Sequence, residues 1–212
     1  MARLLAPGAA YELWAGTYGA FPHNPLMQAE QAVVERLLTH LPSRRALDVG
    51  TGSGRYLPIL ASGGARVVGV DLSMAMLRRA DARARVCADA RRLPFRAASF
   101  DLVNASMMVG DIDELRVWAA EMARVLVRGG HLVYSDFHQV WRERGWQRTF
   151  RDAEGVLRAV AYEPHTIDDH LAALDTARFA VRAIREPRLV VNGRSTPVLA
   201  VFHAVKSGRT VP

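Results

Sequence analysis

Two patterns of apolar and polar positions alternate along this chain, and they mark the expected elements. Short apolar runs, several of them ending in an acid, are typical of buried strands. They occupy residues 45–49, 65–71, 85–89, 100–106 and 131–137. Between them, the sequence favours helices over residues 55–62, 74–82 and 112–127. Strands that alternate with helices predict a parallel sheet with right-handed crossovers and helices on both faces.

Further helices are expected on either side of this alternating region. One begins after Asn24, because Asn and Pro are typical of the N-cap and the first helical position. Its inward face is expected to carry Leu26, Ala29, Val33, Leu37 and Leu41. Thr166 is expected to cap a helix over about 167–178, and residues 111–114 resemble a capping box for the helix before the fifth strand.

The end of the chain is expected to complete a seven-stranded, mostly parallel sheet. Residues 180–190 and 198–206 are the sixth and seventh apolar runs. Asn192-Gly193 lies between them and is a strong hairpin signal, so we expect a C-terminal β-hairpin in the sheet. The chain, residues 1–212, is then a single α/β domain.

Two segments are expected to lie outside the sheet. Within the insertion 138–165, residues 147–151 and 156–162 flank a turn at 152–155, which predicts a small cap hairpin. This hairpin either covers a crevice or makes a dimer contact. Residues 8–24 are rich in aromatic residues and glycine. They form either an N-terminal helix packed on the domain or a lid that closes over a ligand.

Composition narrows the class of protein. Half of the 212 residues are hydrophobic, which allows a substantial core. No run approaches the roughly 20 apolar residues of a membrane-spanning helix, so a cytoplasmic, non-membrane protein is expected. Cys87 is the only cysteine, which excludes an intrachain disulfide and a cysteine metal site. The net charge of +7 comes from scattered arginines, and it favours an acidic small substrate or plain surface charge over nucleic acid.

A glycine-rich turn follows the first expected strand. Residues 46–56 read ALDVGTGSGRY, with an acid and then glycine at every second position. Glycine allows a positive φ and lets a ligand approach the backbone, and the next helix directs free N–H groups at the same place. The dinucleotide fingerprint is G-x-G-x-x-G. Here the third glycine comes one residue early, and Arg55 stands where the fingerprint requires glycine.

Polar residues stand at or just after the ends of the expected parallel strands. They are Asp48, Asp71, Asp89, Ser106 and Asp136. Ligands of open parallel sheets bind beyond the carboxyl ends of the strands, so these side chains are expected to converge on one crevice. A carboxylate at the second strand end, Asp71, is suited to the hydroxyls of a ribose. This feature fits an NAD-binding protein equally well, whereas Asp89 is placed to accept a hydrogen bond from an adenine amino group.

The motifs are weak singly but form a recognisable series. In order they are D-x-G-x-G-x-G, V-x-G-V-D, A-D-A-x-x-L-P-F, F-D-L-V and V-L-V-R-G-G-x-L. The series resembles the class I S-adenosylmethionine (SAM) dependent methyltransferases, and in particular the small-molecule type that includes the quinone-biosynthesis methyltransferases. The resemblance extends over about residues 20–206 and implies a Rossmann-like fold.

The resemblance implies SAM as cofactor and S-adenosylhomocysteine (SAH) as product. Residues 50–52 would hold the methionine part, Asp71 the ribose and Asp89 the adenine edge. The whole set implied or expected at the cofactor is Tyr18, Asp48, Gly50, Thr51, Gly52, Asp71, Leu72, Met76, Asp89, Ala90, Ala105 and Ser106. After the fourth strand the family often carries a histidine, whereas this chain has Gly110, so a base cannot be assigned there by analogy.

The residues that would act on the methyl acceptor are expected elsewhere. An oxygen nucleophile usually needs a base, and His138 follows the fifth strand with Asp136 two residues away to orient its ring. The alternative is a solvated loop histidine beside a helix-capping Asp. Candidate acceptor-binding residues are Tyr11, Trp14, His23, Trp141, Arg148 and His165. The three histidines, His23, His138 and His165, lie in three separate segments, so no metal ion is expected.

The function expected from the sequence is methyl transfer from SAM to a small molecule, first of all to a hydroxyl or carboxylate oxygen. C- or N-methylation is the nearest alternative, because the SAM-binding half does not specify the acceptor. An NAD(P)-binding oxidoreductase and a non-catalytic SAM-binding protein are the other classes. The acceptor is expected to be acidic or aromatic. No nucleic-acid or membrane partner is expected, and the protein is expected to be a monomer or a homodimer.

Overall fold

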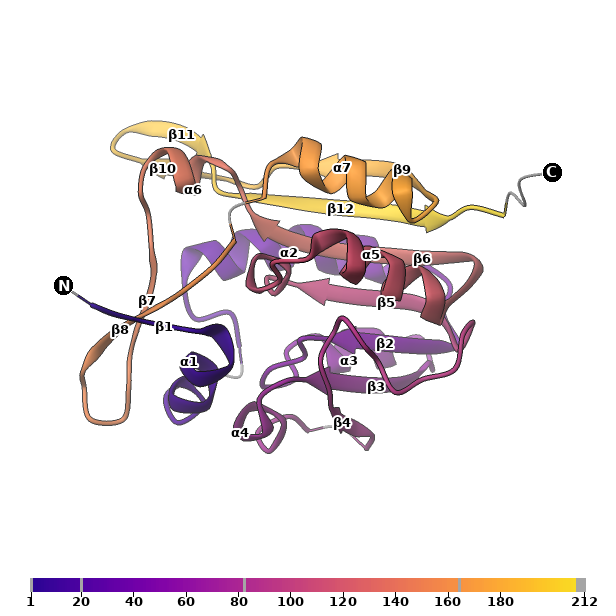
Figure 1. The fold of residues 1–212 in the computed structure, drawn as a ribbon, viewed down its shortest axis with the longest axis horizontal. Helices are drawn as coiled ribbons and strands as arrows, with labels where there is room; N and C mark the ends of the chain where they lie inside the picture. The colour runs from indigo at the N-terminus through magenta and orange to yellow at the C-terminus, as the bar shows by residue number, and fades with distance from the viewer. Residues whose placement is uncertain (1, 20, 82, 164, 209–212) are drawn as a thin grey trace.

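A seven-stranded sheet forms the centre of the protein, in the order β4-β3-β2-β5-β6-β12-β9 (Figure 1). The computed structural model describes residues 2–19, 21–81, 83–163 and 165–208. The strands are β2 (Arg45–Val49), β3 (Arg66–Asp71), β4 (Arg85–Cys87), β5 (Phe100–Ser106), β6 (Leu126–Phe137), β9 (Phe179–Arg185) and β12 (Leu199–Lys206). Only β12 runs antiparallel to its neighbours, β6 and β9. The mostly parallel α/β sheet predicted from the sequence is therefore confirmed.

Helices cover both faces of this sheet (Figure 1). On one face, α2 (Pro25–Thr39) and α3 (Leu57–Ala61) share an apolar cluster with the sheet. On the other face lie α5 (Leu115–Val125) and α7 (Ile167–Thr176), and α4 (Met74–Leu77) packs beside β3 and β4. None of the helices in the described part of the chain has the length and apolarity to cross a membrane.

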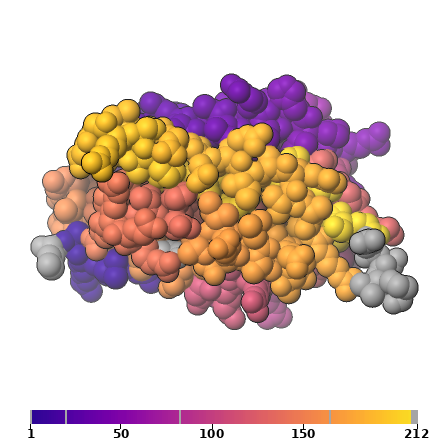
Figure 2. All heavy atoms as spheres, turned by 90° about the horizontal axis from the view of Figure 1, so that it is seen from above, coloured from indigo at the N-terminus to yellow at the C-terminus, as the bar shows by residue number. Residues whose placement is uncertain are grey.

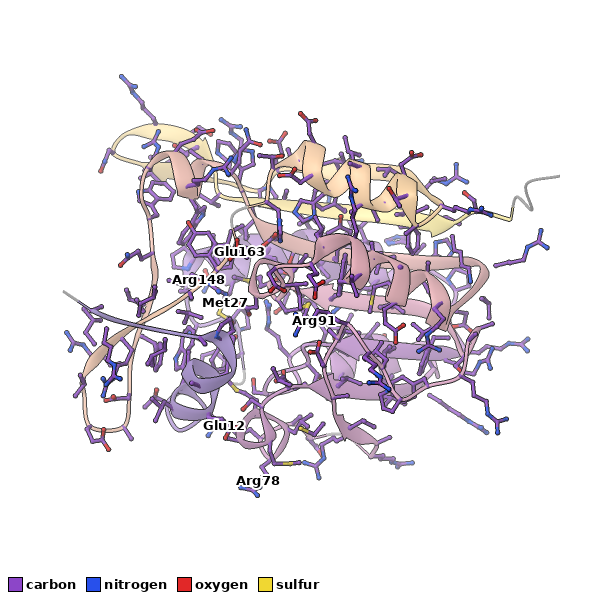
Figure 3. The ribbon with its side chains drawn as sticks, viewed as in Figure 1. Glu12, Met27, Arg78, Arg91, Arg148 and Glu163 are labelled. Atoms are coloured by element: carbon purple, nitrogen blue, oxygen red, sulfur yellow. The ribbon has the colours of Figure 1, made fainter. Side chains whose placement is uncertain are left out.

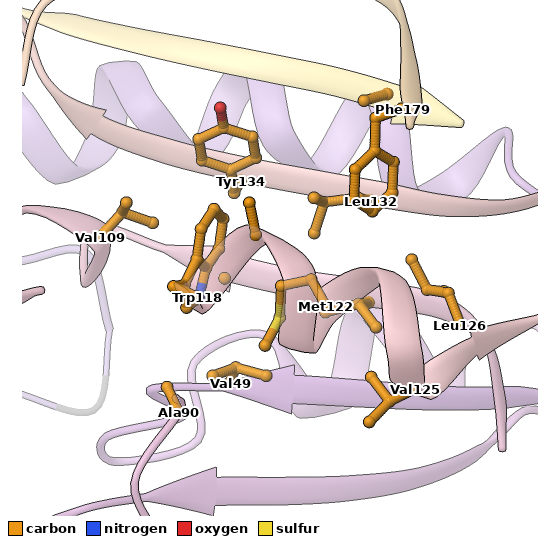
Figure 4. Packing of buried hydrophobic residues seen from close by; sticks show 14 of the residues in the cluster. Val49, Ala90, Val109, Trp118, Met122, Val125, Leu126, Leu132, Tyr134 and Phe179 are labelled. Carbon is orange, nitrogen blue, oxygen red and sulfur yellow. The ribbon is translucent and has the colours of Figure 1, made fainter. Parts of the chain in front are cut away.

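The largest apolar cluster lies between α5 and the sheet (Figure 4). Trp118, Met122 and Val125 recur at helical spacing on one face of α5, and all three are fully buried. The Trp118 ring packs toward β6, where the Tyr134 ring meets it edge-on at 5.0 Å between centroids. Burying one such side chain stabilises a fold by about 1.5–3 kcal/mol, so this contact fixes α5 and the loop before it.

The helix α2 begins where the sequence predicted, but its buried face is rotated by one residue. Asn24 caps it through a hydrogen bond from the Met27 amide at 2.9 Å. The buried residues are Met27, Glu30, Val34 and Leu38, whereas the residues predicted to face inward are only half-buried. Apolar spacing missed this face because Glu30 is fully buried, where Arg55 and two hydroxyl groups pair with its carboxylate.

A small three-stranded sheet and a short helix lie on the side toward which the parallel strands point (Figure 1). The sheet contains β1 (Arg3–Leu5), β8 (Leu157–Val160) and β7 (Arg148–Arg151), and α1 (Pro7–Trp14) follows β1. β7 and β8 form the hairpin expected in the insertion, after the helical turn α6 (Val140–Glu143). The sequence did not predict β1, which has only three residues. Trp14 joins the two segments by stacking on Phe150 at 4.7 Å.

The C-terminal hairpin differs from the prediction. β9 and β12 are antiparallel neighbours in the sheet as expected, but Asn192-Gly193 does not join them directly. It turns a separate two-stranded hairpin of β10 (Arg188–Val191) and β11 (Arg194–Pro197), at one end of the face seen in Figure 2. The positive φ angles of Asn192 (+51°) and Gly193 (+74°) explain why the turn signal was strong. The local turn was predicted correctly, but its strands do not belong to the central sheet.

The two predicted helix caps have different outcomes: the Thr166 cap is confirmed, and the capping box at residues 111–114 is not. Thr166 and Asp169 form a capping box at the start of α7. The box expected at residues 111–114 is wrong, because α5 begins at Leu115 and its cap residue makes no side-chain cap bond. Asp111 instead ends a 3₁₀ turn, η1 (Val109–Asp111), and its carboxylate pairs with Arg148. An ion pair across the fold thus replaces the local hydrogen bond. Ala82, at the expected end of an earlier helix, lies outside the described residues.

Two half-buried histidines pair between β6 and β12. Nδ1 of His131 lies 3.0 Å from Nε2 of His203. Burial and the nearby Arg182 lower the pKa of His131, with Asp101 opposing, while burial, His131 and Arg182 lower the pKa of His203. The unfolded chain therefore binds protons at a higher pH than the folded protein does. Stability is then lost as the pH falls below the ordinary histidine pKa of about 6.5.

Replacing His131 by Gln should reduce this loss of stability on acidification. Glutamine stays neutral and can still hydrogen-bond to His203, so the folded state no longer resists protonation at two adjacent rings. Thermal unfolding of both proteins at pH values from about 8 to about 5 measures the effect. His203→Gln should act similarly, and the two changes together should be less than additive. The same pH dependence in the wild type and both variants would contradict the prediction.

Candidate functional site

A cavity is lined by residues at the carboxyl ends of the parallel strands and by residues of α1, including Tyr11. Figure 1 shows α1 on the side toward which these strands point. The cavity contains about 990 Å³ of space, counting its open mouth, which is the size of a small-molecule site. Of the residues predicted for a site, those in its lining are Tyr11, Tyr18, Asp48, Gly50, Thr51, Gly52, Asp71, Leu72, Met76, Asp89, Ala90 and Ser106. Segments that are distant in the sequence are therefore brought together here.

The glycine turn forms one wall of the cavity. Gly50 and Gly52 have φ angles of +66° and +55°, which favour glycine over other residues. A Cβ on Gly50 would come within 2.6 Å of Cγ of Met108, whereas a Cβ on Gly52 would meet nothing within 4 Å. The first glycine is thus needed for close packing, and the second leaves open space above the backbone in which a ligand can lie.

The floor holds the buried carboxylate of Asp48. Its oxygens accept hydrogen bonds from Oγ1 of Thr51 at 2.6 Å and from Nδ2 of Asn104 at 2.7 Å. Burial raises the pKa of Asp48 to about 6, although these two bonds oppose the shift. Asp48 therefore fixes the turn between β2 and the glycine loop.

The second strand-end acid, Asp71, connects the loop to the neighbouring strand. Its Oδ2 accepts a hydrogen bond from the Gly52 amide and its Oδ1 one from the Ser73 amide, both at 2.8 Å. Burial raises the pKa of Asp71, while these bonds lower it. Leu72 beside it is exposed and Met76 is buried, so the wall here has an apolar surface next to a carboxylate.

The third acid, Asp89, stands at the mouth. Arg91 donates to both of its oxygens, and this pairing lowers the pKa of Asp89. A shallower groove opens beside the cavity at this point, and Arg91, Asp113 and Glu163 line it. Arg91 also pairs with Asp113 at 2.8 Å, so this arginine is shared between two carboxylates.

The wall after β5 continues from Ser106 through Met107 and Met108 to Asp111. Met107 has a positive φ of +56°, and its amide is held by the Ser135 carbonyl at 3.1 Å. Non-glycine residues in this conformation are held by their surroundings and are common at functional sites. Ala105, which was expected at the floor, does not line the cavity in the described structure, because its side chain faces the apolar core.

The N-terminal segment 8–24 contributes two tyrosines to the cavity, Tyr11 and Tyr18. Burial raises the pKa of both phenols. Trp14 and His23 do not line the cavity: Trp14 stacks on the β7–β8 hairpin, and His23 packs edge-on against Tyr18 at 5.6 Å. Ala20 of this segment lies outside the described residues.

The expected dyad of His138 and Asp136 is not formed. His138 pairs with Glu186 at 3.0 Å and does not line the cavity. Asp136 is buried and accepts a hydrogen bond from Nε2 of His170 at 3.1 Å instead. The sequence argument placed the two side chains on one face of an extended chain, but contacts with α7 and with the segment before β10 orient them differently.

The other predicted acceptor-binding residues also lie outside the lining. His165 contacts the Ile112 carbonyl at 2.7 Å, and Trp141 donates to the Val198 carbonyl at 2.9 Å. Arg148 lies between the β7–β8 hairpin and the core (Figure 3). It is buried behind Asp111, and its guanidinium also donates to the Tyr11 hydroxyl at 3.3 Å. Arg148 therefore does not line the cavity itself, but it contacts two residues that do, Asp111 and Tyr11.

Three lining residues that the sequence analysis did not assign are Arg55, Tyr56 and Asp111. Arg55 pairs with the fully buried Glu30 at 2.9 Å, and the Tyr56 hydroxyl donates to the same carboxylate at 2.5 Å. Arg55 had a signal, because it follows the glycine turn where the helix begins. For Asp111 the sequence signal was misleading, because residues 111–114 resemble a capping box.

Replacing Gly50 by Ala should lower the free energy of unfolding by about 1–3 kcal/mol. The new Cβ would meet Met108 and would force a side chain to adopt a positive φ. Chemical denaturation measures the change. Gly63→Ala is the matched control, because a Cβ added there would meet no atom within 4 Å and its φ is not positive. An equal, small effect of both substitutions would show that the turn does not require glycine.

Comparison with known proteins indicates a methyltransferase domain. Residues 47–134 match a family model described as a methyltransferase domain. The chain is 36% identical over 104 residues to a demethylmenaquinone methyltransferase of Corynebacterium urealyticum, covering 48% of this chain and 45% of that one. It is 36% identical over 129 residues to a malonyl-[acyl-carrier protein] O-methyltransferase of Marinomonas sp., covering 52% and 45%. The chain thus spans less than half the length of these curated relatives.

A solved structure agrees at the level of the fold. It is that of a SAM-dependent methyltransferase from Mesorhizobium loti, with a TM-score of 0.67, 23% identity, and coverage of 84% of this chain and 97% of that one. The matched residues 47–134 contain the glycine turn and the acids at the first three strand ends, Asp48, Asp71 and Asp89. Residues 47–134 of this chain therefore match a methyltransferase domain, and the chain has the fold of the solved SAM-dependent methyltransferase.

Proposed function

We propose that this protein transfers a methyl group from SAM to an oxygen atom of a small molecule. The observation that carries the proposal is the single cavity in which the glycine turn meets carboxylates from three successive strand ends. One relative is named an O-methyltransferase, which supports an oxygen acceptor. The cofactor supplies an electrophilic methyl group, so the protein itself needs mainly to align the acceptor and exclude water.

The lining residues fit the parts of SAM. The open space above Gly52 accommodates the methionine part, with the backbone close by. Asp71 presents carboxylate oxygens suited to the two ribose hydroxyls. Leu72 and Met76 provide apolar surface for the adenine, and Asp89 with the Ala90 backbone stands at its polar edge. Both oxygens of Asp48 already accept hydrogen bonds. Asp48 would therefore support binding of the amino group of the methionine part only by fixing the glycine loop.

Arg55 is proposed to bind the carboxylate of the methionine part. Its guanidinium lies in the lining, 4.5 Å from the centre of the Tyr56 ring, with Glu30 on one side. A planar guanidinium can pair with two carboxylates at once, because its donors point in several directions. This role also explains why arginine stands where a dinucleotide-binding loop would need glycine.

The alternatives make different claims about the same cavity. C- or N-methylation uses the same SAM site and differs only at the acceptor; the relative named as a demethylmenaquinone methyltransferase indicates a quinone-type acceptor. An NAD(P)-binding oxidoreductase would need close helix packing at position 55, where a large side chain stands. A non-catalytic SAM-binding protein would bind SAM without consuming it.

Calorimetry with SAM, SAH and NADH tests the proposed cofactor directly. We expect SAM and SAH to bind and NADH to give no heat of binding. Small molecules that co-purify with the protein should then gain one methyl group on incubation with SAM, as measured by mass spectrometry. Binding of NADH without SAM would refute the proposal, and SAM binding without any consumption across an acceptor panel would favour the non-catalytic alternative.

Arg55→Lys should weaken SAH binding by about tenfold. Lysine keeps a positive charge beside the buried Glu30, so the protein should still fold, but it loses the planar fork that reaches a second carboxylate. Calorimetry gives the affinity, and a thermal melt checks the fold. Arg78→Lys is the control, because Arg78 follows α4 and points away from the cavity (Figure 3). An unchanged affinity in the Arg55 variant would remove this residue from the site.

A further inference from the structure

Four carboxylates line the cavity, those of Asp48, Asp71, Asp89 and Asp111. In the first three, each oxygen accepts at least one hydrogen bond from a neighbouring amide, hydroxyl or guanidinium group. These three acids are therefore occupied in holding the loops at the strand ends. Asp111 is bonded differently.

The two oxygens of Asp111 are held differently. Oδ1 accepts a charge-assisted hydrogen bond from Nη2 of Arg148. No hydrogen bond of ordinary geometry from the described residues reaches Oδ2, although the Tyr11 hydroxyl lies close enough to help lower the pKa of the carboxyl group. The enclosed polar side-chain atoms without a partner in this part of the chain are Nε1 of Trp118 and Nε of Arg148. Oδ2 is not among these enclosed atoms, and Asp111 is one of the residues that line the cavity.

The other ionisable groups of the lining are poor proton acceptors. None of the described histidines lines the cavity, and neither does Lys206. Burial raises the pKa of Tyr11 and of Tyr18, so these phenols stay protonated near neutral pH and donate hydrogen bonds. Arg55 carries its proton throughout. Among the described lining residues, Oδ2 of Asp111, on the wall after β5, is then the group best suited to receive a proton.

We propose that Asp111 is the catalytic residue that receives the proton of the methyl acceptor, and that Arg148 is the residue that positions it. This inference rests on the proposed function and adds the class of acceptor: a small molecule whose nucleophile is a hydroxyl or an amine. A carboxylate acceptor is disfavoured, because it would enter a cavity lined by four acids and one arginine and has no proton to remove.

The step balances with these groups alone. A lone pair of the acceptor oxygen or nitrogen forms the new bond to the methyl carbon. The carbon–sulfur bond breaks, and its electron pair stays on sulfur, which becomes the neutral thioether of SAH. The acceptor proton passes to Oδ2 of Asp111 and from there to solvent. The sulfonium charge is thereby lost, and one proton is released for each methyl group transferred.

The surroundings of Asp111 suit this role. Burial raises the pKa of its carboxyl group, which strengthens it as a base, while the positive charge of Arg148 opposes the shift and favours the ionised carboxylate. Arg148 is itself fixed by the Ala161 carbonyl at 3.0 Å and by the Phe137 ring, whose centre lies 4.9 Å away. The cap hairpin thus orients a carboxylate that belongs to the core.

Two SAM analogues test the assignment without a known acceptor. SAH lacks the methyl group, and sinefungin carries an amine-bearing carbon in place of the methyl-sulfonium. If Oδ2 of Asp111 faces the methyl position, this ammonium should pair with it. Wild-type protein should prefer sinefungin over SAH, and Asp111→Asn should lower that preference by about tenfold while leaving the SAH dissociation constant unchanged.

Asp113→Asn is the matched control. It removes the same charge two residues away, where the side chain is exposed and contacts Arg91 rather than the cavity. Its sinefungin preference should equal that of the wild type. Equal preferences in the wild type and Asp111→Asn would overturn the assignment, as would an equal weakening of both analogues, which would indicate a structural role. If neither SAM nor SAH bound the wild type, the proposed function itself would fail.

The pH dependence tests the role of Arg148 and does not require the Asp111 variant to fold. In the wild type, the preference for sinefungin should disappear as Asp111 is protonated at low pH. Arg148→Gln should move this loss to higher pH, because the carboxylate loses its stabilising charge, and Arg148→Lys should restore part of the shift. A purely structural arginine would change the affinity for both analogues without moving this pH profile. That result would contradict the positioning role.

Discussion

The ion pair between Asp111 and Arg148 connects the parts of this protein that surround the cavity. Asp111 follows β5 of the central sheet, Arg148 begins β7 of the cap, and the Tyr11 hydroxyl of α1 contacts the same guanidinium. Both charged side chains are nearly buried, and removing one partner from such a pair leaves an uncompensated charge. The positions of the cap and the N-terminal helix relative to the sheet therefore depend on this pair.

The charge of the cavity is opposite to that of the chain. The protein carries a net charge of +7, yet four carboxylates and one arginine line the cavity. A lining with more carboxylates than cations suits a sulfonium cofactor, and it argues against the acidic acceptor that composition alone favoured. Net charge describes the whole surface, whereas the selection of a ligand depends on the few groups that face it.

The sequence predicts the cofactor side of the site, because the order of strands and helices along the chain determines where the strand-end residues lie. Parallel strands end at one edge of a sheet, so Asp48, Asp71 and Asp89 converge whatever the details of packing. The catalytic prediction had no such support. His138 and Asp136 are close in the chain, but Glu186 and His170, which are distant in the sequence, determine where they point. Asp111 was assigned to a helix cap for the same reason: its partner is 37 residues away, and no local pattern reveals it.

The central claim is that the strand-end cavity binds SAM with its methionine part at Arg55 and its reactive centre facing Asp111. A crystal structure of the protein with SAH tests this most directly. The account predicts ribose hydroxyls on Asp71, the methionine carboxylate on Arg55, and the thioether sulfur open toward the wall that carries Asp111. SAH bound with its sulfur against a closed wall, or with its carboxylate away from Arg55, would contradict the account.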